Sequence, residues 1–191
     1  SVSRRVATIS CLLLATTSCQ EFIDVGVPKT EITTATVFSS DASALATLSG
    51  VYSKMMASQS FTNGELERFT GIYADELINY SSNKERRQFA TASLLNNNAI
   101  VLRYFWAEAY AYILNSNAIL EGVRNSSLLS TAVKNQLEGE ALFIRAFCHF
   151  YLVNLFGDVP YVTSIDYEIN SRIARMTTTE VYLHIICLLY T

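Results

Sequence analysis

The chain has 191 residues, of which half are hydrophobic and only 16% are charged, and it contains seven Gly and two Pro. So few residues that interrupt regular structure argue against a β-sandwich, a β-barrel or a disordered chain, and they favour long helices. With 14 Lys and Arg against 17 Asp and Glu, the net charge is -3, so the sequence lacks the basic field on which nucleic-acid binding depends.

The N-terminal end has the pattern of a secretory signal. Two arginines precede an apolar run at 6–15, and three small residues separate this run from Cys19. The run is about half as long as the roughly 20 residues that span a bilayer, so it predicts a signal peptide at 1–18 instead of a membrane helix. Small residues before a cysteine are typical of lipoprotein signals, although a threonine stands where the usual motif has leucine. Cys19 is the candidate lipidation site, and ordinary secretion is the alternative.

Five helices are predicted after this start. Residues 19–37 are rich in Thr and Val without a helical period, so we expect a lipid-anchored, extended tether there. Residues 38–191 then form one helical domain. Apolar spacing predicts its helices over 41–56, 66–78, 98–123, 130–155 and 177–190. The intervening residues 79–98 are polar and aperiodic, and we expect a loop.

The two longest predicted helices, 98–123 and 130–155, carry apolar residues on two sides, so each is expected to contact neighbours on both. Joined by a short turn they form an antiparallel hairpin, and 177–190 is the expected first helix of another. The predicted fold is therefore all-α, a tetratricopeptide-like helical-repeat scaffold. Because the sequence stops within an apolar helix, we expect it to be truncated.

The helix at 130–155 and the residues after it lead to three local expectations. Gly157 is the expected left-handed stop of the helix, and Pro160 bars its continuation. Asp158, next to the glycine, is expected to fix the turn. One side of the helix is expected to be filled by Phe143, Phe147 and Phe150.

Polar residues among the apolar helices have structural interpretations. Arg145 is the only formal charge in 141–154, so it needs a carboxylate partner, which we expect from another helix because Glu140 lies off the favourable spacing. Trp106 and Asn117 lie on a helical seam, where core packing and a satisfied polar contact are expected.

The sequence contains no motif of a catalytic or metal site. His149 and His184, the only histidines, lie in apolar helical stretches, and no Cys pair or Cys/His cluster has zinc-ligand spacing. Nucleophile elbows, phosphate loops and metalloprotease motifs are absent. Glu138 and Glu140 point to different faces of a helix, which does not suit a glycosidase. We expect no enzyme activity, no metal and no cofactor.

Several blocks of the chain, in order, resemble one family. The strongest is Gly139-Glu140-Ala141-x-Phe143-Ile144-Arg145-Ala146-Phe147-x-His149-Phe150-Tyr151, which is followed by Phe156-Gly157-Asp158-Val159-Pro160. Further blocks are the opening after Cys19, Ala74-Asp75-Glu76, the helix with Trp106, Tyr110, Ile113 and Asn117, and Glu180-Val181-Tyr182. Together they resemble the N-terminal part of the SusD/RagB family of outer-membrane nutrient-binding lipoproteins.

The resemblance implies a non-catalytic lipoprotein on the surface of the outer membrane, anchored through lipid on Cys19. Such a protein binds glycans or other oligomeric nutrients and delivers them to a TonB-dependent, SusC-like transporter. Family members are longer, and much of their ligand face comes from later sequence. Two alternatives stay open: a periplasmic helical-repeat adaptor that binds only proteins, and a non-functional truncated remnant.

The polar loop holds the candidate ligand residues. Sugar binding needs aromatic faces that stack on the pyranose and planar polar groups that hold its hydroxyls. The loop offers both residue types in Asn79, Tyr80, Asn83, Arg86 and Arg87. A solvated loop would have the same composition, and the resemblance assigns no ligand contact to these positions.

Overall fold

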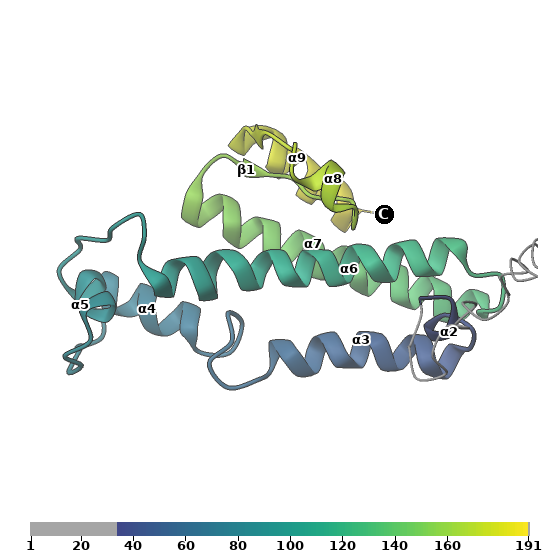
Figure 1. Ribbon diagram of the computed structural model, residues 1–191, viewed down its shortest axis with the longest axis horizontal. Coiled ribbons are helices and arrows are strands. Elements are labelled where there is room, and N and C mark those ends of the chain that lie inside the picture. The colour runs from purple at the N-terminus through teal and green to yellow at the C-terminus, as the bar shows by residue number, and fades with distance from the viewer. Residues whose placement is uncertain (1–33, 191) are drawn as a thin grey trace, which may run out of the picture. The chain divides into compact units, whose positions relative to one another are not determined.

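Helices make up most of residues 34–190, the part of the chain that this computed structural model describes (Figure 1). The long ones are α3 (Asp41–Met55), α6 (Glu108–Asn125), α7 (Thr131–Phe156) and α9 (Thr178–Leu189). A π-helical segment, η2 (Val101–Ala107), leads directly into α6, so one helix runs without a break from 99 to 125. The predicted all-α class is confirmed.

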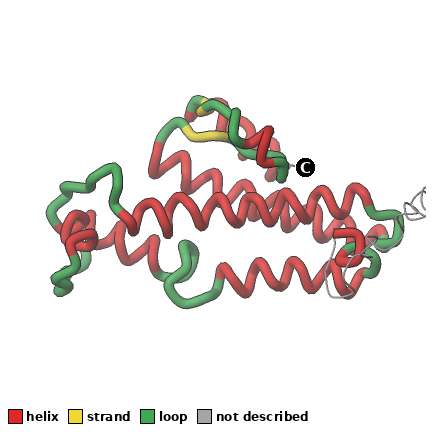
Figure 2. The backbone as a smooth tube through the Cα atoms, in the orientation of Figure 1, coloured by secondary structure: helices red, strands yellow, loops and turns green. Residues whose placement is uncertain are grey.

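The remaining elements are short. They are the helices α2 (Thr34–Val37), α4 (Glu65–Tyr73), α5 (Lys84–Ala90) and α8 (Tyr167–Asn170), and the strands β1 (Val159–Pro160) and β2 (Arg175–Met176). The two strands pair antiparallel, with Val159 opposite Met176, and they are the one sheet among the described residues (Figure 2).

The helices pack as the two-sided apolar patterns predict. α6 and α7 form an antiparallel hairpin, α3 packs against both of them, and α9 packs against α7 (Figure 1). The core between them is continuous and is filled by large side chains such as Tyr112, Ile119, Leu137, Ile144 and Leu152. α4 contacts both α5 and η2, and the aromatic rings of these three helices extend the same core.

Side-chain caps explain where the long helices begin. The hydroxyl oxygen of Ser40 accepts a hydrogen bond from the Ser43 amide, and that of Ser130 accepts one from the Val133 amide. Thr177 and Glu180 form a reciprocal capping box at the start of α9. These caps satisfy amide groups that have no partner within the helix, so they fix its first residue. The predicted starts at 41, 130 and 177 agree with them within one residue.

The predicted boundaries around α4 and α5 are wrong. α4 ends at Tyr73 instead of 78, because Asp75 adopts a positive φ of 59° and the Glu76 amide donates to the Gly71 carbonyl over 2.9 Å. This closing pattern satisfies the last carbonyls of a helix and turns the chain away. α5 then occupies the middle of the predicted loop at 79–98, since its buried Phe89 packs on the ring of Phe69.

Other expectations also need correction. Phe143 and Phe150 do not fill a side of α7, because they are 54% and 42% exposed, whereas Phe147 is half-buried. Gly157 ends α7 with the expected positive φ of 71°, but its ψ of -124° lies outside the left-handed helical region. The last residues of the predicted tether are helical, because α2 covers 34–37.

The predicted signal peptide at 1–18, the lipidation site Cys19 and the tether up to residue 33 lie outside the described residues. None of the helices in the described part of the chain combines the length and the apolar character that crossing a membrane takes.

Candidate functional site

A cleft lies where the chain leaves α4 and enters α5. We name it the Tyr80 cleft; its volume is about 610 Å³ and its lining includes Arg68, Phe69, Ile72, Glu76, Leu77, Ile78, Asn79, Tyr80, Ser81 and Arg86. The floor is apolar, because Phe69 and Ile72 belong to the buried core. The rim is an exposed loop that begins at the turn around Asp75.

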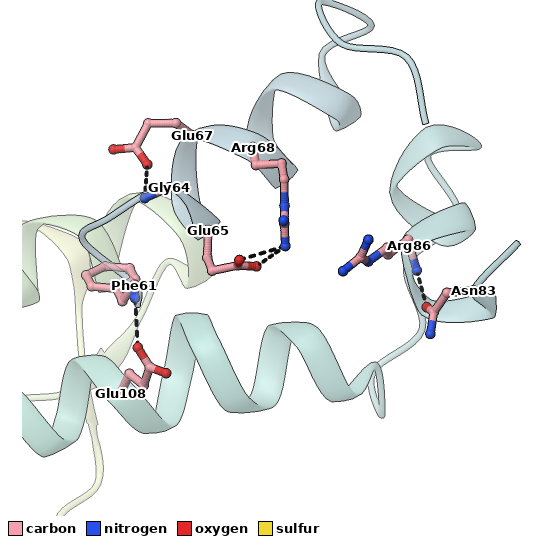
Figure 3. Close-up of polar contacts among 8 residues, drawn as sticks. All are labelled: Phe61, Gly64, Glu65, Glu67, Arg68, Asn83, Arg86 and Glu108. Atoms are coloured by element: carbon pink, nitrogen blue, oxygen red, sulfur yellow. Dashed lines mark hydrogen bonds and ion pairs between the residues drawn. The ribbon is translucent and has the colours of Figure 1, made fainter. Parts of the chain in front are cut away.

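Arg68 forms one wall of the Tyr80 cleft. Its Nη2 donates to both carboxylate oxygens of Glu65, over 2.6 and 2.5 Å, and its guanidinium carbon lies 4.7 Å from the centre of the Phe69 ring (Figure 3). Glu65 is only 2% exposed, so the ion pair compensates a buried carboxylate and holds the guanidinium flat along the wall. The charge of Arg68 is therefore largely neutralised.

Arg86 supplies a second guanidinium, which points from α5 towards Arg68 and Glu65 (Figure 3). Unlike Arg68, it makes neither a hydrogen bond nor an ion pair through this group within residues 34–190. Tyr80 stands at the rim with 90% of its surface exposed. The cleft thus combines an open aromatic face with free planar donors, above an apolar floor.

The other candidate ligand residues have different places. Asn79 lines the Tyr80 cleft, but its amide oxygen accepts from the Ser81 amide and its amide nitrogen donates to the Ser81 carbonyl. Asn83 accepts a hydrogen bond from the Arg86 amide and caps α5. Arg87 lies in a separate depression with Lys84. Of the five candidates, the structure gathers Asn79, Tyr80 and Arg86 at one cleft and leaves Asn83 and Arg87 outside it.

The sequence reasoning missed Arg68, Phe69 and the exposed Leu77 and Ile78. It assigned all four to one helix, which would have left no cleft between α4 and α5. Leu77 continues the apolar spacing of Leu66, Phe69 and Tyr73, so the apolar pattern carries no signal that α4 ends at Tyr73.

The predicted structural residues lie away from the Tyr80 cleft, and Arg145 differs from expectation. Its Nη1 donates over 2.9 Å to the amide oxygen of Asn117, and no carboxylate pairs with it among the described residues. Asn117 is buried and also donates to the carbonyls of Val162 and Ser164. An amide suffices here because Arg145 is half-buried, so water can solvate part of its charge.

The other structural candidates join elements of the scaffold. Trp106 packs its ring 5.0 Å from those of Tyr110 and Phe156. Glu140 accepts a hydrogen bond from Gln136. Burial of the Tyr52 hydroxyl, together with its hydrogen bond to Glu140 and the charge of that carboxylate, raises the pKa of Tyr52 to about 12.

Asp158 does not fix its own turn. Its Oδ1 accepts hydrogen bonds from the amide and the hydroxyl of Thr178, over 2.9 and 3.1 Å, and so joins the end of α7 to the start of α9.

Both histidine rings pack against the Tyr161 ring, each with its centroid 4.5 Å away. His149 is buried and His184 is exposed. Residues 34–190 bring no three of His, Cys, Asp and Glu together in a group that could hold a metal ion.

Comparisons with known proteins agree on one family. A family model described as starch-binding and associating with the outer membrane, SusD-like, matches residues 21–190. A SusD-like protein of Formosa agariphila, P25, is 26% identical over 164 residues, covering 80% of this chain and 30% of its own length. Another from the same organism, P2, is 28% identical over 190 residues, covering 94% and 35%.

A solved structure supports the fold. The crystal structure of a SusD-like carbohydrate-binding protein from Bacteroides fragilis matches with a TM-score of 0.65 at 20% identity, over 80% of this chain and 31% of that protein. The chain therefore spans about a third of the length of these relatives.

Proposed function

Because this chain belongs to the SusD-like family, we propose that it binds oligosaccharides at the outer membrane and holds them in the Tyr80 cleft. The observation that supports the cleft most strongly is that it holds both the exposed ring of Tyr80 and the guanidinium of Arg86, which no residue of 34–190 pairs. The family description, starch-binding, makes maltooligosaccharides the first ligands to test.

Each part of the cleft suits a sugar chain. An exposed tyrosine ring stacks on the C–H face of a pyranose, and a guanidinium donates to two neighbouring hydroxyls at once. The turn between Asn79 and Ser81 fixes the backbone on both sides of Tyr80, so the backbone that carries the ring needs little further ordering on binding. The apolar floor excludes water from beneath the sugar.

We propose that the protein binds without catalysis. Glycoside hydrolysis uses two carboxyl groups, one on each side of the scissile bond. Both oxygens of Glu65 are engaged by Arg68, which leaves Glu76 as the one unengaged carboxylate among the residues that line the described cleft. A captured oligosaccharide would then pass unchanged to a TonB-dependent, SusC-like transporter, with Cys19 carrying the lipid that holds the protein at the surface.

The first experiment measures maltoheptaose binding by isothermal titration calorimetry. We expect Tyr80→Ala to weaken binding about 30-fold and Arg86→Ala about tenfold, as losses of an aromatic contact and a charged hydrogen bond. Arg87→Ala removes the same charge from the same helix outside the cleft, and we expect no change. Unchanged affinity in both cleft variants would contradict the proposed site.

A second experiment tests the location. Proteinase treatment of intact cells should degrade the protein, and a Cys19→Ala variant should no longer partition with the outer-membrane fraction. A periplasmic adaptor would instead resist the proteinase, because the outer membrane would protect it.

A further inference from the structure

A second cleft lies between the start of α5 and η2. We name it the Tyr104 cleft; its volume is about 310 Å³, and Asn83, Glu85, Ile100, Arg103 and Tyr104 line it. Asn83 lines this cleft and Arg86 lines the other, and a hydrogen bond of 3.0 Å joins the Arg86 amide to the Asn83 side chain. The residues that open α5 therefore belong to both clefts.

The Tyr104 cleft has the same chemistry as its neighbour. The guanidinium of Arg103 lies over the ring of Tyr104, 5.1 Å from its centre. Arg103 is exposed, and within the described residues no hydrogen bond or ion pair occupies its N–H groups. Stacking keeps the planar fork in place while its donors stay available. Glu85 and the amide nitrogen of Asn83 add an acceptor and a donor, a set that suits a polyhydroxylated ligand.

Asn98 holds the two clefts in a fixed relation. This residue is 2% exposed, and its amide nitrogen donates to the Glu85 carbonyl over 3.1 Å and to the Gln88 side chain over 2.9 Å. Its amide oxygen accepts from the amides of Ile100 and Val101, where the helix that carries Arg103 begins. α5 and η2 are therefore tied by one buried side chain. The π-helical winding of η2 fits a binding role, since such segments often lie at functional sites.

We propose that the Tyr104 cleft is a second sugar subsite and that one oligosaccharide chain occupies it together with the Tyr80 cleft. This inference rests on the proposed function and adds to it that the ligand is recognised as an oligomer. A short sugar fills the Tyr80 cleft alone, whereas a long one also reaches Arg103. Because the two clefts are pre-arranged, the second contact costs little additional ordering, and affinity rises with chain length.

The test compares maltotriose with maltoheptaose on the full chain by isothermal titration calorimetry. In the unaltered protein we expect maltoheptaose to bind about tenfold more tightly, the effect of one charged hydrogen-bonding group. Arg103→Ala should remove this advantage and leave maltotriose binding unchanged. Arg103→Lys keeps the charge and loses the planar fork, so it should also lose most of the affinity advantage of maltoheptaose. Arg87→Ala is the matched control and should preserve the tenfold ratio.

The outcomes separate the two proposals. If Tyr80→Ala weakens the binding of both sugars while Arg103→Ala changes neither, the second subsite is wrong and the proposed function stands. If neither sugar binds to the unaltered chain, or neither Tyr80→Ala nor Arg86→Ala has an effect, the Tyr80 cleft is not the sugar site and both proposals fail. Equal weakening of both sugars by Arg103→Ala would also contradict the inference, because Arg103 would then contact the short ligand.

Discussion

His149 shows how a single buried side chain joins helix α7 to the segment that follows it. The ring is fully buried; its Nδ1 lies 2.9 Å from the Arg145 carbonyl oxygen, and its Nε2 accepts a hydrogen bond from the Val162 amide. A carbonyl can only accept and an amide can only donate, so the ring is neutral with its proton on Nδ1. Burial is the main cause that lowers the pKa of His149 from its usual 6.5 to about 4; the hydrogen bond to the Arg145 carbonyl opposes it, and the nearby charges of Arg145 and His184 add to it.

This pKa predicts a loss of stability on mild acidification. Above pH 6.5 the histidine is neutral in both states, but between pH 6.5 and about 4 only the unfolded chain takes up the proton, so the free energy of unfolding falls as the pH falls. The slope should be roughly 1.4 kcal/mol per pH unit, up to about 3 kcal/mol. Urea unfolding at pH 7, 6 and 5 measures it. His149→Gln should show a correspondingly shallower dependence, and parallel curves for the two proteins would contradict the assignment.

At the scale of elements, the predicted starts of α3, α7 and α9 coincide with side-chain caps, whereas α5, which Asn83 caps in the same way, was not predicted. Ser40, Ser130 and Thr177 are visible in the sequence as caps, and the helices that follow them begin where predicted. The ends of α4 and α5 instead use Asp75 and Ala92 at φ values of 59° and 47°, where glycine is the usual residue. A non-glycine residue seldom adopts this conformation, so the sequence gives no sign of either end.

The ends of α4 and α5 could not be predicted, and for this reason part of the candidate site was missed. Tyr80 and Arg86 could be chosen by residue chemistry alone, because sugar binding needs those side chains. Arg68 and Phe69 could not, since their role depends on α4 ending at Tyr73 and on the loop turning back over its last turn. The Glu76 and Leu77 amides both donate to the Gly71 carbonyl, and this local closure creates the cleft wall.

We expect Asn98 to stabilise the junction between α5 and the helix at 99–125. Asn98→Ala removes a cap of the helix at 99–125 and two hydrogen bonds to α5, so we expect the free energy of unfolding to fall by roughly 2 kcal/mol. Asn98→Ser keeps a capping oxygen without adding a charge and loses the donations to α5, so it should cost about half as much. Hydrogen exchange should accelerate over 84–90 in both variants. Unchanged stability in the variant that keeps the cap, or unchanged exchange over 84–90 in both variants, would show that Asn98 does not tie the two elements.

For the described part of the chain as a whole, the segment at 159–164 decides how the last elements attach to the hairpin. Three side chains from the long helices bind its backbone. The Tyr110 hydroxyl donates to the Pro160 carbonyl over 2.9 Å, Asn117 donates to the Val162 and Ser164 carbonyls, and His149 accepts from the Val162 amide. Polar side chains are needed here because a buried irregular segment cannot satisfy its own backbone groups. Apolar periodicity alone cannot predict such attachments.

Asn117 is the centre of this attachment, since it binds the segment and also accepts from Arg145. Asn117→Ala leaves two backbone carbonyls and a half-buried guanidinium without this partner, and we expect the free energy of unfolding to fall by about 3 kcal/mol. Arg145→Met removes the guanidinium and keeps an apolar stem. In the Asn117→Ala background it should therefore cost at least about 1 kcal/mol less than it costs alone, because no buried charge is left unpaired.

A double-mutant cycle by urea unfolding measures this coupling between Asn117 and Arg145. The matched control is Arg172→Met, just after α8, a side chain that is 80% exposed and whose one ion pair among the described residues is with Glu168. Its small effect should simply add to that of Asn117→Ala, since an exposed ion pair contributes little to stability. Additive losses for Asn117 and Arg145 would mean that the guanidinium is solvated independently of the amide. The segment at 159–164 would then be held by the amide's hydrogen bonds to its carbonyls, with no contribution from Arg145.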